Sequence, residues 1–181
     1  MQGVKEREAV QLRPTTLEDA HDLFEAVVES RRELHTWMPW CHPGYCLDDA
    51  RLFLAKNDET FRAGTEYHFV ITAADGRFLG ICGLNGIDPT QRSANLGYWV
   101  RTSATGRGVA SDAVRLLVEW AFRSTELDRL EIVAAVGNLA SQQVAAKAGA
   151  VFERVAWKKL RLHDAYHDAA IFSFSRAEMA E

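Results

Sequence analysis

The chain has 181 residues, 48% of them hydrophobic, which suits one domain with a substantial core and is too short for two, so we expect a single domain spanning residues 1–181. The formal net charge of −4 argues against general nucleic-acid binding, and no apolar run approaches the roughly 20 residues that cross a bilayer. Three cysteines are an odd number without paired metal-ligand spacing, which argues against a disulfide framework and against a metal site.

In chain order, the first half reads as a strand, helices and then a meander of strands. The charged stretch Met1 to Arg7 is not followed by the apolar core of a signal peptide, so we expect a cytoplasmic protein. Thr16, followed three residues later by Asp19, resembles a capping box and predicts a helix to about Ser30. The other elements predicted here are a strand at Val10 to Pro14, a helix at Leu47 to Ala63, and strands at Tyr67 to Ala73, Phe78 to Leu84 and Ala94 to Arg101.

A glycine-rich turn then leads from a strand directly into a helix. The strand pattern Leu96 to Val100 is followed by Thr105-Gly106-Arg107-Gly108-Val109-Ala110, after which apolar residues recur at helical spacing. Such a turn leaves backbone N–H groups unpaired at the positive end of the helix dipole, which favours phosphate binding. The turn lacks the terminal Lys-Ser/Thr of a P-loop and the three glycines of a dinucleotide-binding motif, so both are disfavoured. A turn that uses glycines only for steric reasons stays an alternative.

The remaining chain predicts a strand, a helix and two further strands. Leu130 to Val136 reads as a strand, and Asn138-Leu139-Ala140-Ser141 opens a helix that ends at Lys147-Ala148-Gly149. Asparagine is a good helix N-cap and glycine a good C-terminal stop, so both also have a purely structural explanation. Strands at Val151 to Leu162 and Tyr166 to Phe174 complete a mixed, mostly antiparallel sheet with helices on both faces.

Together these segments resemble the GNAT superfamily of N-acetyltransferases. The family's cofactor loop is written Gln/Arg-x-x-Gly-x-Gly/Ala; Thr105, Gly108 and Ala110 fall on its three fixed positions, and Thr105 departs from the pattern. The resemblance implies the α/β (α+β) GNAT fold, with about seven strands. Four segments resemble the RimJ/RimL branch, whose members include enzymes that acetylate the N-terminal amine of ribosomal proteins: Leu34 to Trp40, Leu96 to Val100, Asn138 to Ser141 and Ala165 to Asp168.

The resemblance implies acetyl-CoA as cofactor, bound along the fourth strand and the glycine turn. In GNAT relatives the fourth and fifth strands splay apart, which leaves backbone groups near Tyr98 to Arg101 for the pantetheine amides. Two arginines near the turn could supply positive charge, although arginines in such places are commonly just solvated. The residues expected to bind the cofactor are Val100, Arg101, Thr105, Gly106, Arg107, Gly108, Val109, Ala110, Asn138 and Lys147.

Acetyl transfer to an amine needs a neutral amine, a hydrogen-bond donor to the developing oxyanion and a proton for the thiolate. The resemblance implies a backbone N–H at about Trp99 or Val100 as the oxyanion donor. Ser141 is the candidate proton donor, unless it only satisfies helix amides. An α-amine with a pKa of roughly 8 is about one-tenth neutral at pH 7, so a single carboxylate acting through water suffices, and Glu66 is one candidate base. His167 and Asp168 are another candidate pair, although polar groups at a strand start more often hold a turn.

The acceptor pocket is expected around Trp37, Trp40 and parts of the segment from Glu29 to Cys46, with Glu33 beside a cationic amine. Tyr166 and His167 are expected to join it from the late hairpin. Core packing explains the two tryptophans equally well. The expected function is acetyl-CoA-dependent N-acetylation of RimJ/RimL type, with an α-amine of a protein or peptide as acceptor. Two alternatives stay open: a small-molecule amine, such as an aminoacyl antibiotic or a metabolite, and a non-catalytic acyl-CoA-binding module. Relatives are often dimers, which allows for a homodimer.

Overall fold

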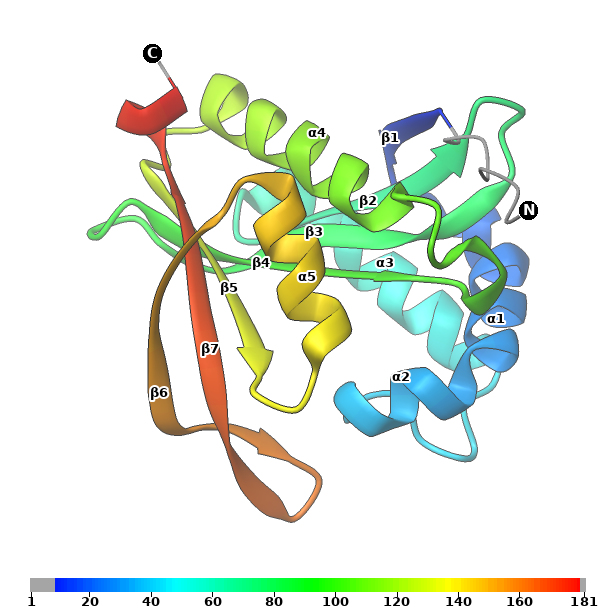
Figure 1. Cartoon of the computed structure of the whole chain (residues 1–181). Helices are drawn as coiled ribbons and strands as arrows, with labels where there is room; N and C mark the ends of the chain where they lie inside the picture. Colours follow the sequence, from blue (N-terminus) through cyan, green and yellow to red (C-terminus); the bar gives the residue numbers. More distant parts are fainter. Residues whose placement is uncertain (1–8, 180–181) are drawn as a thin grey trace, which may run out of the picture.

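A seven-stranded sheet forms the centre of the structure, a computed structural model that describes residues 9–179. The charged stretch Met1 to Arg7 lies outside the described residues. Neighbouring strands are antiparallel except β4 and β5, which are parallel, so the predicted mixed, mostly antiparallel sheet is confirmed (Figure 1). In the order β1-β2-β3-β4-β5-β7-β6, the sheet contains Val10–Pro14 (β1), Tyr67–Ala73 (β2), Phe78–Asp88 (β3), Ser93–Val100 (β4), Arg129–Ala135 (β5), Val151–Leu162 (β6) and Ala165–Ser175 (β7).

Helices cover both faces of this sheet, as predicted (Figure 1). One face carries α1 (Ala20–Glu29), α2 (Arg31–Trp37) and α3 (Leu47–Ala63), and the other carries α4 (Val109–Ser124) and α5 (Leu139–Ala148). Short 3₁₀ turns occupy Leu17–Asp19, Thr102–Ala104 and Arg176–Met179. Within residues 9–179, no helix is long and apolar enough to cross a membrane.

Each face of the sheet has its own apolar core. On the face covered by α4 and α5, Leu117 of α4 packs with Leu96 and Leu130 of the strands, and all three side chains are fully buried. On the face covered by α1, α2 and α3, Leu23 of α1 and Leu54 of α3 belong to a separate cluster that Trp99 of β4 also contacts. Because side chains alternate along a strand, Leu96, Tyr98 and Val100 face the α4–α5 core and Trp99 faces the other core. β4 thus presents side chains to both halves of the molecule.

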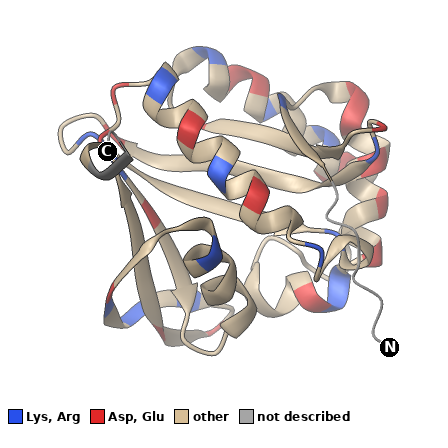
Figure 2. Ribbon diagram, turned by 45° about the horizontal axis from the view of Figure 1, so that its top comes forward, with Lys and Arg blue, Asp and Glu red and all other residues tan. Residues whose placement is uncertain are grey.

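Charged residues on the helices are mixed in sign. Along α4, Asp112, Arg115, Glu119 and Arg123 follow one another at helical spacing, and Figure 2 shows this alternation of acidic and basic residues on the ribbon. Asp112 and Arg115 form an ion pair of 2.6 Å. Such a mixed face is typical of a solvated helix surface.

Two sequence predictions need correction. The helix predicted from Thr16 to Ser30 starts as a 3₁₀ turn and ends at Glu29. Ser30 is not helical, and a second helix, α2, begins after it; the sequence pattern did not predict this helix. The third strand continues to Asp88 instead of stopping at Leu84. A bulge in its pairing with β4 bends the strand there, and Asp88 Oδ1 then accepts hydrogen bonds from the loop N–H groups.

Candidate active site

The turn between β4 and α4 ends in a helix N-terminus without a side-chain cap. Gly106 and Gly108 have φ values of 74° and 83°, in the left-handed region that favours glycine, and Gly108 is the N-cap residue of α4. The N–H groups of Val109, Ala110 and Ser111 have no acceptor within the helix and lie at the positive end of its dipole. The turn therefore offers an anion-binding cradle made of main-chain amides.

The hydroxyl of Thr105 is used inside this turn. Its Oγ1 donates to the Thr102 carbonyl oxygen at 2.8 Å, and the Thr105 N–H donates to the same oxygen at 3.2 Å. The side chain that departs from the family pattern thus helps to close the turn.

The end of α1 holds the turn from the other side of β4. Glu29 accepts hydrogen bonds from Arg101 Nε at 2.8 Å and from the Ser103 N–H at 2.7 Å, and Ser30 Oγ accepts one from the Thr102 N–H at 2.8 Å. The hydrogen bond from Arg101 lowers the pKa of Glu29 to about 2. These contacts fix the residues that lead into the amide cradle.

The structure corrects the prediction that the two nearby arginines face the cofactor. Arg101 is turned toward α1, because its guanidinium binds Glu29 and the Phe78 carbonyl oxygen. Arg107 is half-buried between the two glycines of the turn. Neither side chain lines the groove that the turn opens into.

A groove of about 440 Å³ runs from the amide cradle along β4 to α5 and α2. It brings together twelve of the sequence-predicted site residues from four elements and the loop, and residues that were not predicted, among them Tyr98, Met38 and Gln143, line it too. The predicted residues that line it are Val100, Thr105, Gly106, Gly108, Val109, Ala110, Asn138 and Lys147 from the cofactor set, with Ser141 and Trp99 from the catalytic set. Trp37 and Glu33, predicted for the acceptor pocket, line this groove as well.

One wall of the groove is the unpaired edge of β4. The parallel pairing of β4 with β5 runs only from Ser93↔Arg129 to Asn95↔Glu131, so the strands part after Asn95, as the family resemblance implies (Figure 1). Beyond that point β4 pairs with β3 alone. An extended ligand can add to such an edge as a further strand.

The register decides which β4 amides face this gap. Arg101 N–H donates to the Leu79 carbonyl oxygen at 2.8 Å, and pairing alternates along an antiparallel ladder, so Trp99 also directs its N–H toward β3. The N–H groups of Tyr98 and Val100 therefore face the gap. The prediction of an oxyanion donor at about Trp99 or Val100 therefore narrows to Val100, because the Trp99 N–H faces β3.

Ser141 lies at the first turn of α5, across the groove from β4. Its N–H donates to Asn138 Oδ1 at 3.1 Å, which caps the helix, so its hydroxyl is not needed as a cap. Ser141 Oγ lies 3.0 Å from the hydroxyl of Tyr98, which also contacts the Ser141 carbonyl oxygen at 2.8 Å. Burial raises the pKa of Tyr98 to about 12, so this phenol keeps its proton at neutral pH. Two hydroxyl groups thus meet where the groove passes β4.

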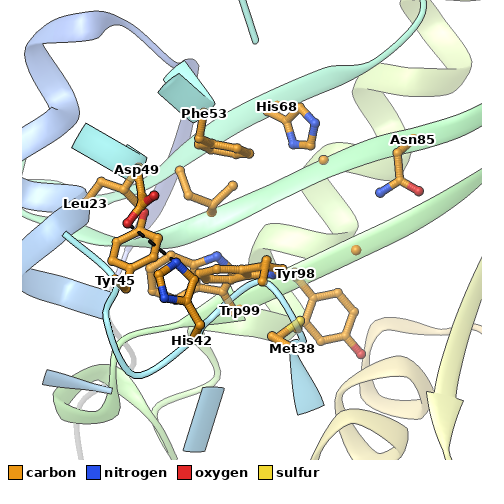
Figure 3. A pocket seen from close by; sticks show the side chains of 14 residues that line it. Leu23, Met38, His42, Tyr45, Asp49, Phe53, His68, Asn85, Tyr98 and Trp99 are labelled. Atoms are coloured by element: carbon orange, nitrogen blue, oxygen red, sulfur yellow. Dashed lines mark ion pairs between the residues drawn. The ribbon is translucent and has the colours of Figure 1, made fainter. Parts of the chain in front are cut away.

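A second cavity, also of about 440 Å³, lies on the α1–α3 face of the sheet. Figure 3 shows Phe53, His68 and Asn85 on one side of it and Tyr45, His42 and Trp99 on the other. Most of the lining is apolar, and Asp49 forms an ion pair of 3.6 Å with His42. The complete lining comprises Leu23, Met38, Trp40, His42, Tyr45, Asp49, Phe53, His68, Ile81, Gly83, Asn85, Gly97, Tyr98 and Trp99.

Two opposed glycines form the floor of this cavity. Gly83 of β3 and Gly97 of β4 are direct partners in the register. A Cβ atom on Gly97 would meet only Asn85 Nδ2, at 3.9 Å, whereas one on Gly83 would lie 2.6 Å from His68 Nδ1 and from the Tyr67 carbonyl oxygen. The space above Gly97 is therefore open because that residue has no side chain.

Met38, Tyr98 and Trp99 line both spaces, so the groove and the cavity meet at β4. A ligand in the groove and a ligand in the cavity can approach each other there. This arrangement suits transfer of a group between two bound molecules.

The other predicted site residues lie apart. Glu66 lines neither space and contacts His68, with 3.2 Å between Glu66 Oε2 and His68 Nε2. Tyr166 and His167 are exposed on β7, so the prediction that they line the acceptor pocket is corrected. Their hairpin reaches α2 instead, where His163 Nε2 lies 2.7 Å from the His35 carbonyl oxygen.

Asp168 does not hold a turn but supports an irregularity in the pairing of β6 with β7, between Ala156 and Leu160. Its Oδ1 accepts a hydrogen bond of 2.8 Å from the backbone N–H of Lys158, whose φ is 47°. Of the five residues named for the acceptor pocket, Trp40 lines the cavity; the predicted segment from Glu29 to Cys46 also contributes Met38, His42 and Tyr45. His68 and Asn85 went unnoticed in the sequence, although glycines at 83 and 97 inside strand patterns are a signal of close approach or open space.

Residues 9–151 match the acetyltransferase (GNAT) domain family. The chain is 28% identical over 174 residues to the Bacillus subtilis protein YdaF, covering 96% of this chain and 95% of that protein. It is 26% identical over 170 residues to the ribosomal-protein-serine acetyltransferase of Escherichia coli, covering 94% of each. The structure is similar to that of Mycobacterium smegmatis RimJ in complex with CoA-disulfide, with a TM-score of 0.87 and 25% identity over 97% of this chain and 86% of that one.

Proposed function

The chain belongs to the GNAT family of N-acetyltransferases, and on that premise we propose that it transfers the acetyl group of acetyl-CoA to the N-terminal α-amine of a protein or peptide. The Escherichia coli relative supports the choice of acceptor, because it is a ribosomal-protein-serine acetyltransferase. RimJ of Mycobacterium smegmatis, in complex with CoA-disulfide, supports the cofactor. A ribosomal protein is thus the preferred acceptor, and a cytoplasmic location accords with it.

The groups that line the groove suit the chemistry of coenzyme A. The amides of residues 106–111 and the dipole of α4 suit a pyrophosphate, and Lys147 adds a positive charge on the exposed side. The backbone groups of Tyr98 and Val100, which face the gap between β4 and β5, suit the amides of an extended pantetheine arm. Bound there, acetyl-CoA supplies the acetyl group as a thioester.

The residues of the chain then act on the two reactants. The Val100 N–H, in the gap beside β4, stabilises negative charge on the acetyl oxygen, since a fixed backbone donor costs little reorganisation. Ser141 Oγ, hydrogen-bonded to Tyr98, gives a proton to the departing sulfur. Trp99, which lines both spaces, separates the groove from the acceptor cavity except where the reacting atoms meet.

The observation that carries this proposal is the junction of the groove and the cavity at Tyr98 and Trp99. The test is release of free thiol from acetyl-CoA with a panel of N-terminal peptides, including ribosomal-protein N-termini, against small amines. We expect turnover on peptides, with mass spectrometry placing the acetyl group on the α-amine. Turnover on small amines alone would refute the peptide acceptor, and acetyl-CoA binding without any turnover would refute an enzymatic role.

A small amine is the second candidate, because the acceptor cavity is mostly apolar and aromatic. Trp40, Tyr45, Phe53 and Trp99 surround a space larger than a serine or alanine side chain needs. An arylalkyl amine fits such a lining, and this compound class therefore belongs in the panel.

A further inference from the structure

His68 lines the acceptor cavity but has no role in the acetyl transfer proposed above. It lies on β2 opposite Gly83 of β3, which in turn lies opposite Gly97 of β4, so the three residues form one row across the sheet. Its side chain is 13% exposed and lines the cavity, with Phe53 packed edge-on against the ring at 5.3 Å (Figure 3).

The ring leans over the glycine floor toward β4. His68 Nδ1 lies 2.6 Å from where a Cβ of Gly83 would be. Directly opposed, hydrogen-bonded partners in an antiparallel ladder have Cα atoms about 5.5 Å apart, so Nδ1 is roughly one strand spacing from Gly97. An amine that enters the open space above Gly97 comes within reach of Nδ1, directly or through one water molecule.

Glu66 fixes the tautomer of this histidine. A carboxylate can only accept a hydrogen bond, so the contact of 3.2 Å between His68 Nε2 and Glu66 Oε2 requires the proton on Nε2. The lone pair of the neutral ring is then on Nδ1, which is the nitrogen over the glycine floor. Lys56 of α3 holds the other oxygen of Glu66 at 3.6 Å.

The charged groups around His68 leave it neutral and able to accept a proton. Burial holds the pKa of the imidazole below its ordinary value, which outweighs the opposing effect of Glu66, and Lys56 adds to the lowering. Across the cavity, Asp49 of α3 faces His42 and accepts the Cys46 N–H at 2.8 Å, so this carboxylate is already occupied. Asn85 of β3 is uncharged.

We propose that His68 is the catalytic base, taking a proton from the acceptor amine through Nδ1, and that Glu66 is a positioning residue that orients the ring. This inference rests on the proposed acetyl transfer. The ammonium group loses one proton to Nδ1, and its nitrogen then forms the bond to the acetyl carbon while the carbon–sulfur bond breaks. As the amide forms, the nitrogen releases its second proton; Ser141 gives its hydroxyl proton to the sulfur and recovers a proton from that released one through solvent. His68 passes the first proton to solvent.

The experiment compares wild type, His68→Gln, Glu66→Gln and the control His21→Gln, an exposed histidine of α1 that does not line the cavity. Turnover is measured from pH 5.5 to 9.5 at saturating acetyl-CoA with an α-amine acceptor. We expect His68→Gln to lose at least about tenfold at pH 7 and to approach wild type near pH 9, because an amine with a pKa of roughly 8 is neutral there without help.

The outcomes separate the two proposals. If wild type releases no thiol with any amine, the proposed function fails. If wild type is active and His68→Gln shows the same profile, or a loss that is equal at every pH, the role of His68 fails. Glu66→Gln should move the acid limb of the pH–turnover profile to lower pH, because removal of the Glu66 carboxylate disfavours the protonated form of the His68 ring. An NMR titration of the His68 ring reports the same shift independently of activity, and an unchanged ring titration would contradict the positioning role.

Discussion

Adding one methyl group at Gly97 tests whether the cavity above it receives the acceptor. The Cβ of Gly97→Ala would contact only Asn85 Nδ2, at 3.9 Å, which is an ordinary van der Waals distance. The fold should therefore tolerate it, and the loss of a strand glycine should raise the free energy of unfolding by about 0.5–1 kcal/mol. The same methyl group occupies the place where the amine approaches β4.

The expected effect on activity is large and selective. One methylene more or less in a binding pocket changes discrimination by about 1–3 kcal/mol, which corresponds to roughly 10–200-fold in kcat/KM for the acceptor. The KM for acetyl-CoA should stay the same, because Gly97 does not line the groove. Steady-state kinetics with each substrate varied in turn, together with urea unfolding, measure both effects.

Gly83→Ala is the matched control, since it adds the same group to the directly opposed residue. Its Cβ would lie 2.6 Å from the Tyr67 carbonyl oxygen and from His68 Nδ1, so this variant should lose about 1–3 kcal/mol of stability. A stable Gly97→Ala protein with unchanged acceptor kcat/KM would refute the assignment of the cavity. A Gly83→Ala protein as stable as wild type would refute the packing argument.

Three further predictions concern the groove and its supports. Ser141→Ala should lower kcat at saturating acetyl-CoA with little change in acetyl-CoA affinity, and an unchanged kcat from pH 6 to 9 would exclude the proton-donor role. Thr105→Ala should leave acetyl-CoA affinity within about threefold by calorimetry, because the Thr105 hydroxyl binds within the turn, whereas Gly108→Ala should weaken it more than tenfold because its φ of 83° disfavours a side chain. Glu29→Gln should destabilise the protein by about 1–2 kcal/mol at pH 7. The carboxylate has a lowered pKa of about 2, so its contribution is present above the unfolded-state pKa of about 4.3 and is lost as the pH falls toward 2; the gap between wild type and variant in urea unfolding should close over that range.

Local sequence signals predicted the amide cradle well. Two glycines before an amphipathic helix specify left-handed residues and an open helix N-terminus, and these depend on a few adjacent residues only. The boundaries of β1, α3, β2 and β6 agree with the sequence prediction for the same reason, since turn residues and hydrophobic periodicity are local. The parting of β4 and β5 was implied only by the family resemblance.

The acceptor cavity depends on contacts that no local pattern contains. His68, Gly83 and Gly97 meet because three strands pair in one register, and the loop before α3 brings His42 and Tyr45 over them. Likewise, the Trp99 N–H points toward β3 because every second residue of β4 directs its N–H to that strand, and the register decides which residues these are. Tyr166 and His167 looked like pocket residues in the sequence, yet their long hairpin carries them to an exposed position.

A crystal structure of the protein with coenzyme A tests most directly whether the cofactor binds along β4 and the amide cradle. We predict the pyrophosphate on the amides of residues 106–111, the pantetheine arm along Tyr98 and Val100, and the sulfur within hydrogen-bond distance of Ser141 Oγ. A coenzyme bound elsewhere, or a sulfur that does not reach the junction of the groove and the acceptor cavity, would contradict this prediction.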